Sequence, residues 1–421
     1  MTMGNATSQR LKAVLRRAVL GMAGTMMLTG AALSADDLTA KLDAWLKQNQ
    51  FGAYHAEENW EAITAAAKKE GEVVIYASSA QLKKVAEDFM KVYPEIKVTA
   101  HDLGSSKTVE KTIREHDASI YAVDIVSTTG ARAMVFEMLP NKNIINYVPS
   151  YLVSRIPEKY REPLLVRVLE GQAFTYNIEV NPNGAPISNI WELTEPKWKG
   201  RFAMKNPLSS LSTVACVMAL VANSDAVADA YKKHTGKDLV LSKGAENAGY
   251  EFWKQMLAND PVIFKSGSKL ATATGKAGQK NPPVSMASVH YLVRNKTKGL
   301  VNGVMTKVEP AALMEYPTYT AVARFAPHPN AAKLMTAFIM GSPELNANSK
   351  LEAPFDKGAS AKLLQGLSSE YRIGVAPPRS DVPPHPDNGV WYEVKHLGAS
   401  AEFIAKNGAK FADFWTIESS K

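Results

Sequence analysis

A strand, a small polar turn, a helix and a second strand follow one another directly between residues 70 and 99. Residues 73–76 form a continuous apolar run, which is typical of a strand covered on both faces. Apolar side chains then recur at helical spacing over residues 81–92, and Pro94 ends that pattern. Residues 96–99 read as the next strand. Two parallel strands joined by a crossover helix restrict the chain to an α/β fold.

The same alternation continues along the chain. Strands are predicted at residues 124–128, 173–177, 201–204, 262–264, 284–287 and 318–323, and helices between them. With 421 residues the chain is too long for one typical domain. The simplest interpretation is two α/β lobes, each a mainly parallel sheet with helices on both faces. The first lobe is built from segments before and after the second.

These patterns give a set of expected boundaries. Lobe 1 takes residues 70–174 and 310–345, and lobe 2 takes residues 175–309. Residues 36–69 form an N-terminal helical extension, and residues 346–421 a C-terminal extension that packs on the lobes. The Pro pairs 377–378 and 383–384 predict an extended surface segment in that extension.

Residues 1–35 have the pattern of a cleaved secretory signal peptide. A basic stretch from Arg10 to Arg17 precedes a short apolar run, and small residues follow near positions 31–35. The adjacent Arg16 and Arg17 leave a twin-arginine signal open as the export route. Retention of the segment as a membrane anchor is the other alternative. We expect a protein secreted to the periplasm.

Charge argues against a nucleic-acid partner. The net charge is +8, and four positive charges precede residue 36, where there is no acidic residue; subtracting four from +8 leaves +4 for the rest. The remaining Lys and Arg residues are interspersed with Asp and Glu, with no basic stripe and interleaved aromatics. Such a modest excess is typical of a soluble protein with a mild attraction for anions.

The sequence lacks the common catalytic signatures. No HExxH, phosphate-binding loop, GxGxxG after the first strand or GxSxG motif is present, and no histidines have metal-ligand spacing on one helix. The single cysteine, Cys216, lies in an apolar helical run and is expected to be buried and inert. We therefore predict no enzyme activity, no cofactor and no metal site, with a secreted hydrolase as the alternative.

Hydroxyl side chains gather where predicted strands end and helices begin. Because ligands of open α/β sheets lie at the carboxyl ends of strands, these turns are candidate binding sites, although Ser and Thr are also ordinary helix caps. The candidates are Ser78, Ser79, Ser127, Thr128, Thr129, Ser209, Ser210, Ser212, Thr213, Ser266 and Ser268.

Five further side chains complete the predicted ligand site. Arg132 and Lys269 each follow such a turn and can pair with a carboxylate or phosphate. His290 and Tyr291 follow the strand at 284–287, and Tyr319 lies where the chain returns to the first lobe. The alternative for each is a solvated charge or an ordinary core residue.

Several segments together resemble the ferric-iron-type extracellular solute-binding proteins of ABC transporters. They are the signal-like N-terminus, the stretch Gly-Glu-Val-Val-Ile-Tyr-Ala-Ser at residues 71–78, Ala-Val-Asp-Ile-Val at 122–126, Leu-Thr-Glu-Pro-Lys-Trp-Lys-Gly-Arg at 193–201, and the helix at 330–340 with its Ser-Pro-Glu turn. The resemblance covers roughly residues 70–345. It implies a type 2 periplasmic binding protein fold, with two lobes, a hinge of two crossing segments and a cleft that closes on one solute.

The chain departs from the iron-binding members of that family at two places. It has Val289-His290-Tyr291 where they offer adjacent tyrosines, and Ser78-Ser79-Ala80-Gln81 where they often carry a histidine. The resemblance therefore favours a small anionic organic solute (a carboxylate, phosphate ester or phosphonate) over ferric ion, which remains the alternative. It also implies a monomer that docks on an ABC permease in the inner membrane, or on a sensor kinase instead.

Overall fold

The computed structural model describes residues 35–52, 57–342, 363–371, 373–382 and 389–421. The predicted signal peptide therefore lies outside the described residues except for Ala35, as do Pro383 and Pro384. The chain divides into two units, residues 1–44 and residues 45–421. Every strand among the described residues lies in the second unit. These strands are β1 Glu72–Ala77, β2 Lys97–Asp102, β3 Ile125–Thr129, β4 Ile144–Ile145, β5 Val166–Asn177, β6 Phe202–Lys205, β7 Val262–Phe264, β8 Val284–Ser288, β9 Asn302–Val304, β10 Leu313–Ala323 and β11 His396–Leu397.

Helices fill most of the connections between these strands. The α-helices are α2 Ala35–Gln48, α3 Trp60–Glu70, α4 Gln81–Val92, α5 Ser105–Asp117, α6 Glu158–Arg161, α7 Leu211–Ala222, α8 Ser224–Thr235, α9 Ala248–Ala258, α10 Gly267–Gly275, α11 Val293–Lys298, α12 Pro329–Met340, α14 Gly366–Tyr371, α15 Gly389–Glu393 and α16 Ala401–Glu418. The short η helices are η1 Arg132–Met138, η2 Ser150–Leu152, η3 Ile190–Thr194, η4 Pro196–Trp198, η5 Pro207–Ser209 and η6 Val289–Leu292.

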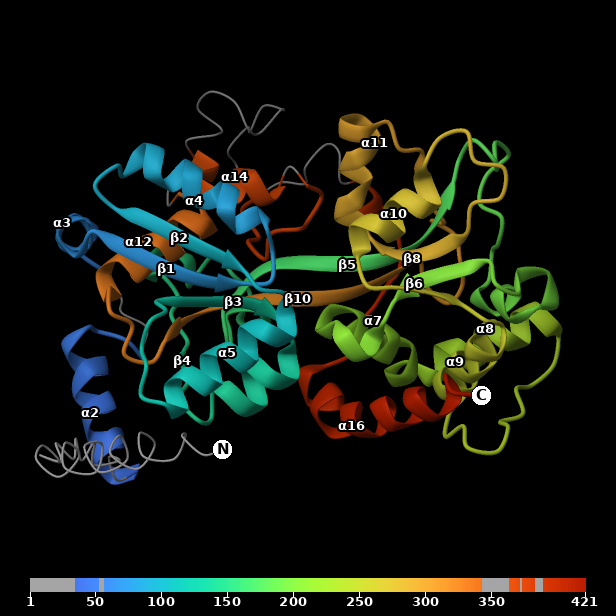
Figure 1. Ribbon diagram of the computed structural model, residues 1–421, viewed down its shortest axis with the longest axis horizontal. Coiled ribbons are helices and arrows are strands. Elements are labelled where there is room, and N and C mark those ends of the chain that lie inside the picture. Colours follow the sequence, from blue (N-terminus) through green and yellow to red (C-terminus); the bar gives the residue numbers. More distant parts are fainter. Residues whose placement is uncertain (1–34, 53–56, 343–362, 372, 383–388) are drawn as a thin grey trace, which may run out of the picture. The chain divides into compact units, whose positions relative to one another are not determined.

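Two long strands join the two lobes of the second unit. The main path through the sheet runs β2-β1-β3-β10-β5-β8-β6-β7. Strand β1 pairs in parallel with β2 and β3 on one side, and β6 pairs in parallel with β7 and β8 on the other. Between them β10 and β5 are antiparallel to each other and to their outer neighbours. Figure 1 shows β5 and β10 crossing from one lobe to the other, which confirms the predicted α/β fold with two connecting segments.

Each lobe has its own hydrophobic core. In lobe 1, Ile75 and Val85 pack with Phe338 of α12. In lobe 2, Trp191 and Trp253 pack with the apolar helix α7, and Cys216 is buried there, as predicted. Within the described part of the chain no single helix is long and apolar enough to cross a membrane. Helices α7 and α8 pass that test only when combined, and they are bent by 69° at their junction.

The C-terminal extension differs from the prediction around its first Pro pair. Pro377 and Pro378 are buried, and the adjacent Ala376 forms two backbone hydrogen bonds with Leu169 of β5, of 2.8 and 3.0 Å. Tertiary packing thus holds this segment against the connecting strand, whereas the Pro pair alone had predicted a surface segment. Helix α14 packs on α4 and α12, and α16 packs on α7, α9 and η1. The extension therefore contacts elements of both lobes.

Close packing of α9 on α7 predicts that Gly249 tolerates no side chain. A Cβ at Gly249 would lie 2.6 Å from the carbonyl oxygen of Leu220 and would also overlap the Cα of Val221. We expect Gly249→Ala to lower the free energy of unfolding by about 1–3 kcal/mol, because two backbones must move apart.

Urea unfolding followed by circular dichroism measures this effect. Gly408→Ala is the matched control, because the nearest atoms to a Cβ there, in Arg132 and Ile404, are 4.0 Å away. That helical substitution should raise stability by about 0.5–1 kcal/mol. Equal effects at the two glycines would contradict the prediction.

Candidate functional site: a cavity between the lobes

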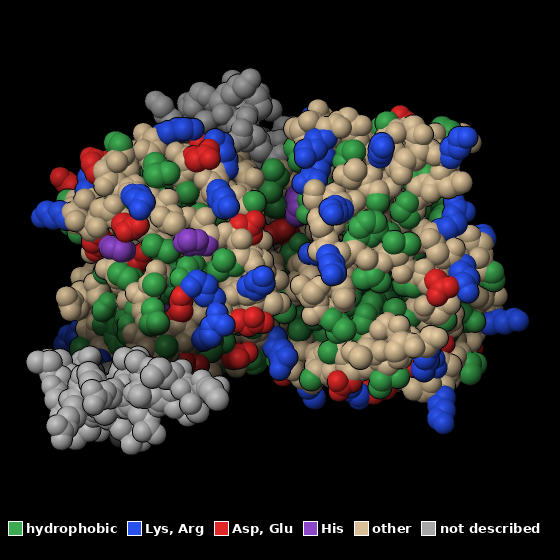
Figure 2. Space-filling model, in the orientation of Figure 1, with side chains coloured by type: hydrophobic (Ala, Val, Ile, Leu, Met, Phe, Trp, Pro, Cys, Tyr) green, Lys and Arg blue, Asp and Glu red, His purple; other side chains and the backbone are tan. Residues whose placement is uncertain are grey.

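A cavity of about 520 Å³ lies where the strands of both lobes end. The ends of β1, β2 and β3 contribute from lobe 1, and the ends of β6, β7 and β8 from lobe 2. Figure 2 shows the groove between the lobes, with Lys and Arg side chains along its edge on the α10 and α11 side. This is the position that ligands take in open α/β sheets, at the carboxyl ends of parallel strands.

Eight of the sixteen predicted site residues line this cavity. They are Ser78, Ser79, Thr129, Ser209, Ser210, Ser212, His290 and Tyr291. They come from both lobes, so the fold brings together turns that are more than 200 residues apart in the sequence. A hydroxyl where a strand gives way to a helix located the six serines and threonines among them, whereas His290 and Tyr291 were predicted because they follow the strand at 284–287.

The other eight predicted residues do not line the cavity. Ser127 is buried and donates to the Tyr319 carbonyl, while Thr128 is buried and donates to the carbonyl of Thr129. Tyr319 itself lies in the core. Arg132 and Lys269 are exposed elsewhere.

Three of these eight have structural hydrogen bonds close to the cavity. Ser266 caps α10 by accepting from the backbone N–H of Lys269, and Ser268 accepts from Arg294. Thr213 donates to Ser210 Oγ at 3.1 Å and accepts from Gln172 Nε2 at 3.2 Å. Thr213 therefore orients a lining hydroxyl without lining the cavity itself.

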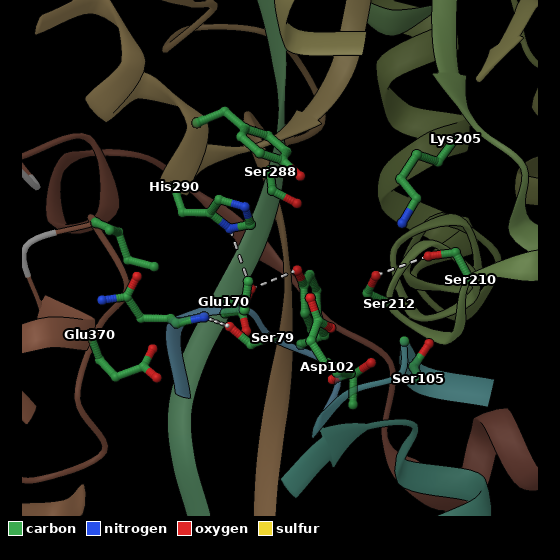
Figure 3. Close-up of a pocket in the computed structure, with 18 of the residues that line it drawn as sticks. Ser79, Asp102, Ser105, Glu170, Lys205, Ser210, Ser212, Ser288, His290 and Glu370 are labelled. Atoms are coloured by element: carbon green, nitrogen blue, oxygen red, sulfur yellow. Dashed lines mark hydrogen bonds and ion pairs between the residues drawn. The ribbon is translucent and has the colours of Figure 1, made fainter. Parts of the chain in front are cut away.

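One end of the cavity combines hydroxyls, a helix N-terminus and a lysine. Ser210 caps α7, and its Oγ lies 3.1 Å from Ser212 Oγ. Lys205 ends β6, and Figure 3 shows its side chain extending toward this serine pair. Burial lowers the pKa of Lys205, and the negative charge of Glu170 opposes that shift. We call Lys205, Ser210 and Ser212 the anion end, because a lysine and the N-terminus of a helix both attract negative charge.

The middle of the cavity is held by Glu170, a residue of the connecting strand β5. Its carboxylate accepts from Thr318 at 2.8 Å and from Tyr316 at 3.1 Å, and it lies 3.4 Å from His290 Nδ1. Burial raises the pKa of Glu170, but the hydrogen bond and charge of His290, the charge of Arg167 and the Thr318 hydroxyl together lower it to about 2.

This depressed pKa predicts a pH dependence of stability. A carboxyl whose pKa falls from 4.5 in the unfolded chain to about 2 in the folded protein stabilises the fold above pH 4.5. The stabilisation, about 3 kcal/mol in full, is lost as the pH falls from 4.5 through 2. Glu170→Gln should remove this part of the acid sensitivity.

Urea titrations at pH 5, 4, 3 and 2 test the prediction. The wild-type protein should lose more stability across this range than Glu170→Gln does. The exposed Glu87, which pairs with Lys84 on the surface, supplies the control Glu87→Gln, whose profile should follow the wild type. Parallel profiles for the wild type and Glu170→Gln would contradict the prediction.

The opposite end of the cavity is formed by the C-terminal extension. Glu370 of α14 lines the cavity and forms an ion pair with Arg167 of β5, and their side chains are 2% and 1% exposed. Burial raises the pKa of Glu370, whereas the Arg167 charge opposes the shift. Figure 3 shows Glu370 on the side away from Lys205, Ser210 and Ser212, with Glu170 and His290 between them.

Several lining residues were missed by the sequence analysis. Ser105 and Ser288 carry the same strand-end hydroxyl signal as the predicted turns, and Lys205 and Lys265 end β6 and follow β7. The remaining missed polar residues are Gln81, Asp102, Glu170, Arg294 and Glu370. Glu170 and Glu370 had no local signal, because one lies within a long strand and the other in the C-terminal extension.

Among the described residues, no cluster of three or more His, Cys, Asp and Glu side chains has the arrangement of a metal site. Tyr291 and Tyr316 both line the cavity, however, and tyrosine oxygens also bind metal ions. Burial raises the pKa of both phenols. Tyr291 also carries the Arg294 guanidinium 4.6 Å from its ring centroid.

Comparison with known proteins identifies the fold. No family model and no curated protein matches the sequence. Among solved structures, iron-bound HitA from Pseudomonas aeruginosa has a TM-score of 0.59 at 13% identity and covers 83% of this chain and 98% of its own. A ferric binding protein from Campylobacter jejuni has a TM-score of 0.58 at 13% identity, covering 82% and 99%. The binding protein AgtB from A. tumefaciens R10, in complex with agropinic acid, has a TM-score of 0.56 at 14% identity, covering 83% and 99%. The predicted resemblance is therefore confirmed at the level of the fold, and this chain has the two-lobed fold of the periplasmic binding proteins.

Proposed function

We propose that this protein is a periplasmic solute-binding protein of an ABC importer, which captures a small anionic organic solute in the cavity between its lobes. The anion end carries this proposal: Lys205 and the serine pair Ser210 and Ser212 surround the N-terminus of α7. Lysine, hydroxyls and helix N–H groups suit a carboxylate, a phosphate ester or a phosphonate. A volume of about 520 Å³ is that of a small-molecule site.

Closure of the lobes about β5 and β10 would enclose the solute. We propose lobe 1 as residues 70–174 and 310–345 and lobe 2 as residues 175–309, with hinge motion where the two long strands cross. The lobes already meet near the cavity, where the Leu211 N–H of α7 donates to Ser105 Oγ of α5 at 3.4 Å. The protein is proposed to act as a monomer, exported by the signal peptide of residues 1–35, and to bind rather than transform its ligand.

The closed form would then dock on a permease in the inner membrane. A sensor kinase is the other partner that a ligand-binding protein of this fold can serve. Co-purification with an inner-membrane permease or with a sensor kinase would discriminate between the two.

Thermal unfolding in the presence of candidate solutes tests the proposal. A carboxylate, phosphate ester or phosphonate at about 100 times its Kd should stabilise the protein by about 2.7 kcal/mol. Lys205→Met should abolish most of that stabilisation while leaving the ligand-free protein folded. If organic anions fail and ferric ion binds tightly, the organic-anion proposal is wrong.

Ferric ion is the second candidate, and the tyrosines in the cavity favour it. Tyr291, Tyr316 and His290 lie around Glu170, so oxygen and nitrogen donors are present together. HitA and the Campylobacter jejuni protein among the structural neighbours are described as iron-bound and ferric-binding, respectively. A visible charge-transfer band on adding ferric salt, lost in Tyr291→Phe, would support this candidate against the organic anion.

A further inference from the structure

The cavity has two chemically different ends. The anion end holds Lys205 and the serine pair at the α7 N-terminus, whereas the far end holds the Glu370 carboxylate (Figure 3). If the ligand had an anionic group and no other polar group, that group would bind at the anion end. The Glu370 carboxylate would then face an apolar part of the ligand. The two ends therefore indicate which chemical groups the ligand carries in addition to its anionic group.

Two acidic side chains of the cavity have capacity for a further donor, Asp102 and Glu370, and Glu370 is the buried one of the two. Among the described residues, Arg167 is its hydrogen-bond partner and contacts one carboxylate oxygen, Oε1. A carboxylate can accept at both oxygens. By contrast, Glu170 already accepts from Thr318 at one oxygen and from Tyr316 at the other, with His290 also adjacent.

The position of Glu370 is fixed by its neighbours in α14. Ser369 donates to Asp88 of α4 at 2.7 Å, and its carbonyl accepts from Gln81 Nε2 at 2.6 Å. Gly366 lies so close to the Phe338 carbonyl of α12 that a Cβ there would be 2.8 Å away. The carboxylate is thus held rigidly at the wall of the cavity, as a selective ligand contact requires.

We infer that the ligand carries an ammonium group as well as its anionic group, and that Glu370 accepts the ammonium while Lys205, Ser210 and Ser212 hold the anion. This inference rests on the proposed function and names its substrate class: a small amino-substituted carboxylate, phosphate ester or phosphonate. Glu370 is then a specificity-determining residue supplied by the C-terminal extension. An ammonium donates up to three hydrogen bonds, so it can engage the free Oε2 while Arg167 keeps Oε1.

Matched ligand pairs test the inference by isothermal titration calorimetry on the whole protein. Phosphoethanolamine and ethyl phosphate differ by one ammonium group, and so do β-alanine and propionate. The amine-bearing member of at least one pair should bind at least tenfold more tightly than its partner. Equal affinities within both pairs would overturn the inference and leave anion binding intact. Absence of binding by all four compounds would overturn both the inference and the proposed anion site.

Two variants assign the preference to its residue. The double variant Arg167→Met with Glu370→Gln removes both charges together, and its ratio of affinities within a pair should fall to about one while ethyl phosphate or propionate still binds. A preference that persists in this folded variant would overturn the role of Glu370. Lys205→Met is the control, and it should weaken both members of a pair by the same factor. If the double variant does not fold, the wild-type comparison alone decides whether the ligand carries an ammonium.

Discussion

Arg167→Met is expected to lower the free energy of unfolding by about 3–5 kcal/mol, one of the largest effects of any single polar substitution in this chain. The side chains of Arg167 and Glu370 are 1% and 2% exposed and pair with each other. Removing the cation leaves a carboxylate that is buried without its partner charge. Replacing one partner of a buried ion pair lowers the free energy of unfolding by far more than the intact pair contributes, because the remaining charge stays desolvated.

A double-mutant cycle of Arg167→Met, Glu370→Gln and the combined variant separates the cost of the unpaired charge from the contribution of the ion pair. Arg167→Met combined with Glu370→Gln should recover most of the lost stability, because neutral groups of similar size often replace a buried ion pair at little cost. The difference in stability between Arg167→Met and the wild type should be smaller at low pH, because protonation neutralises the unpaired Glu370 carboxylate. Lys199→Met, in a surface pair with Asp260 whose partners are 63% and 66% exposed, is the control and should change stability little.

Chemical denaturation of the two single variants, the double variant and Lys199→Met at pH 8 and pH 5 measures the free energy of unfolding of each. A loss under about 1 kcal/mol in Arg167→Met would mean that Glu370 is neutral or hydrated in the folded protein, and the carboxylate acceptor proposed for the ligand would lose its basis. Stability measurements and ligand-binding measurements thus test the charge of Glu370 independently.

The fold was predictable because its signals are local. A buried strand, a polar turn and an amphipathic helix each leave a pattern within about ten residues, and β1, α4 and β3 appear where those patterns lie. The same reasoning located half of the predicted cavity lining, since Ser79, Thr129 and Ser210 stand where a strand ends or a helix begins.

The remainder of the site depends on distant packing. Tyr316 faces the cavity and Tyr319 lies in the core, although both belong to β10. Which of them lines the cavity is decided by where β10 crosses between the lobes, and no local pattern marks that crossing. Glu370 joins Arg167 across 203 positions of sequence, so only the folded chain reveals the pair.

The C-terminal extension lies outside the sequence resemblance, yet its last helix completes a hydrophobic core. Ile404, Phe411 and Trp415 are buried along one face of α16. The Trp415 ring lies 5.8 Å from that of Trp253 at an interplanar angle of 60°, and Phe411 lies 5.9 Å from Tyr250. These contacts place α16 within the core of lobe 2.

We therefore expect Trp415→Ala to lower the free energy of unfolding by about 3–5 kcal/mol, because it opens a cavity beside Trp253 that the surrounding helices cannot fill. Ile417, two residues later, is 57% exposed, so Ile417→Ala is the matched control and should change stability by no more than about 0.5 kcal/mol.

Urea unfolding followed by tryptophan fluorescence measures the stability of both variants. A loss below about 1 kcal/mol for Trp415→Ala would mean that α16 is an accessory segment. A loss of the expected size would mean that the extension is required for the stability of lobe 2. Because α16 also packs on η1 of lobe 1, relative motion of the lobes must change its contacts with one of them.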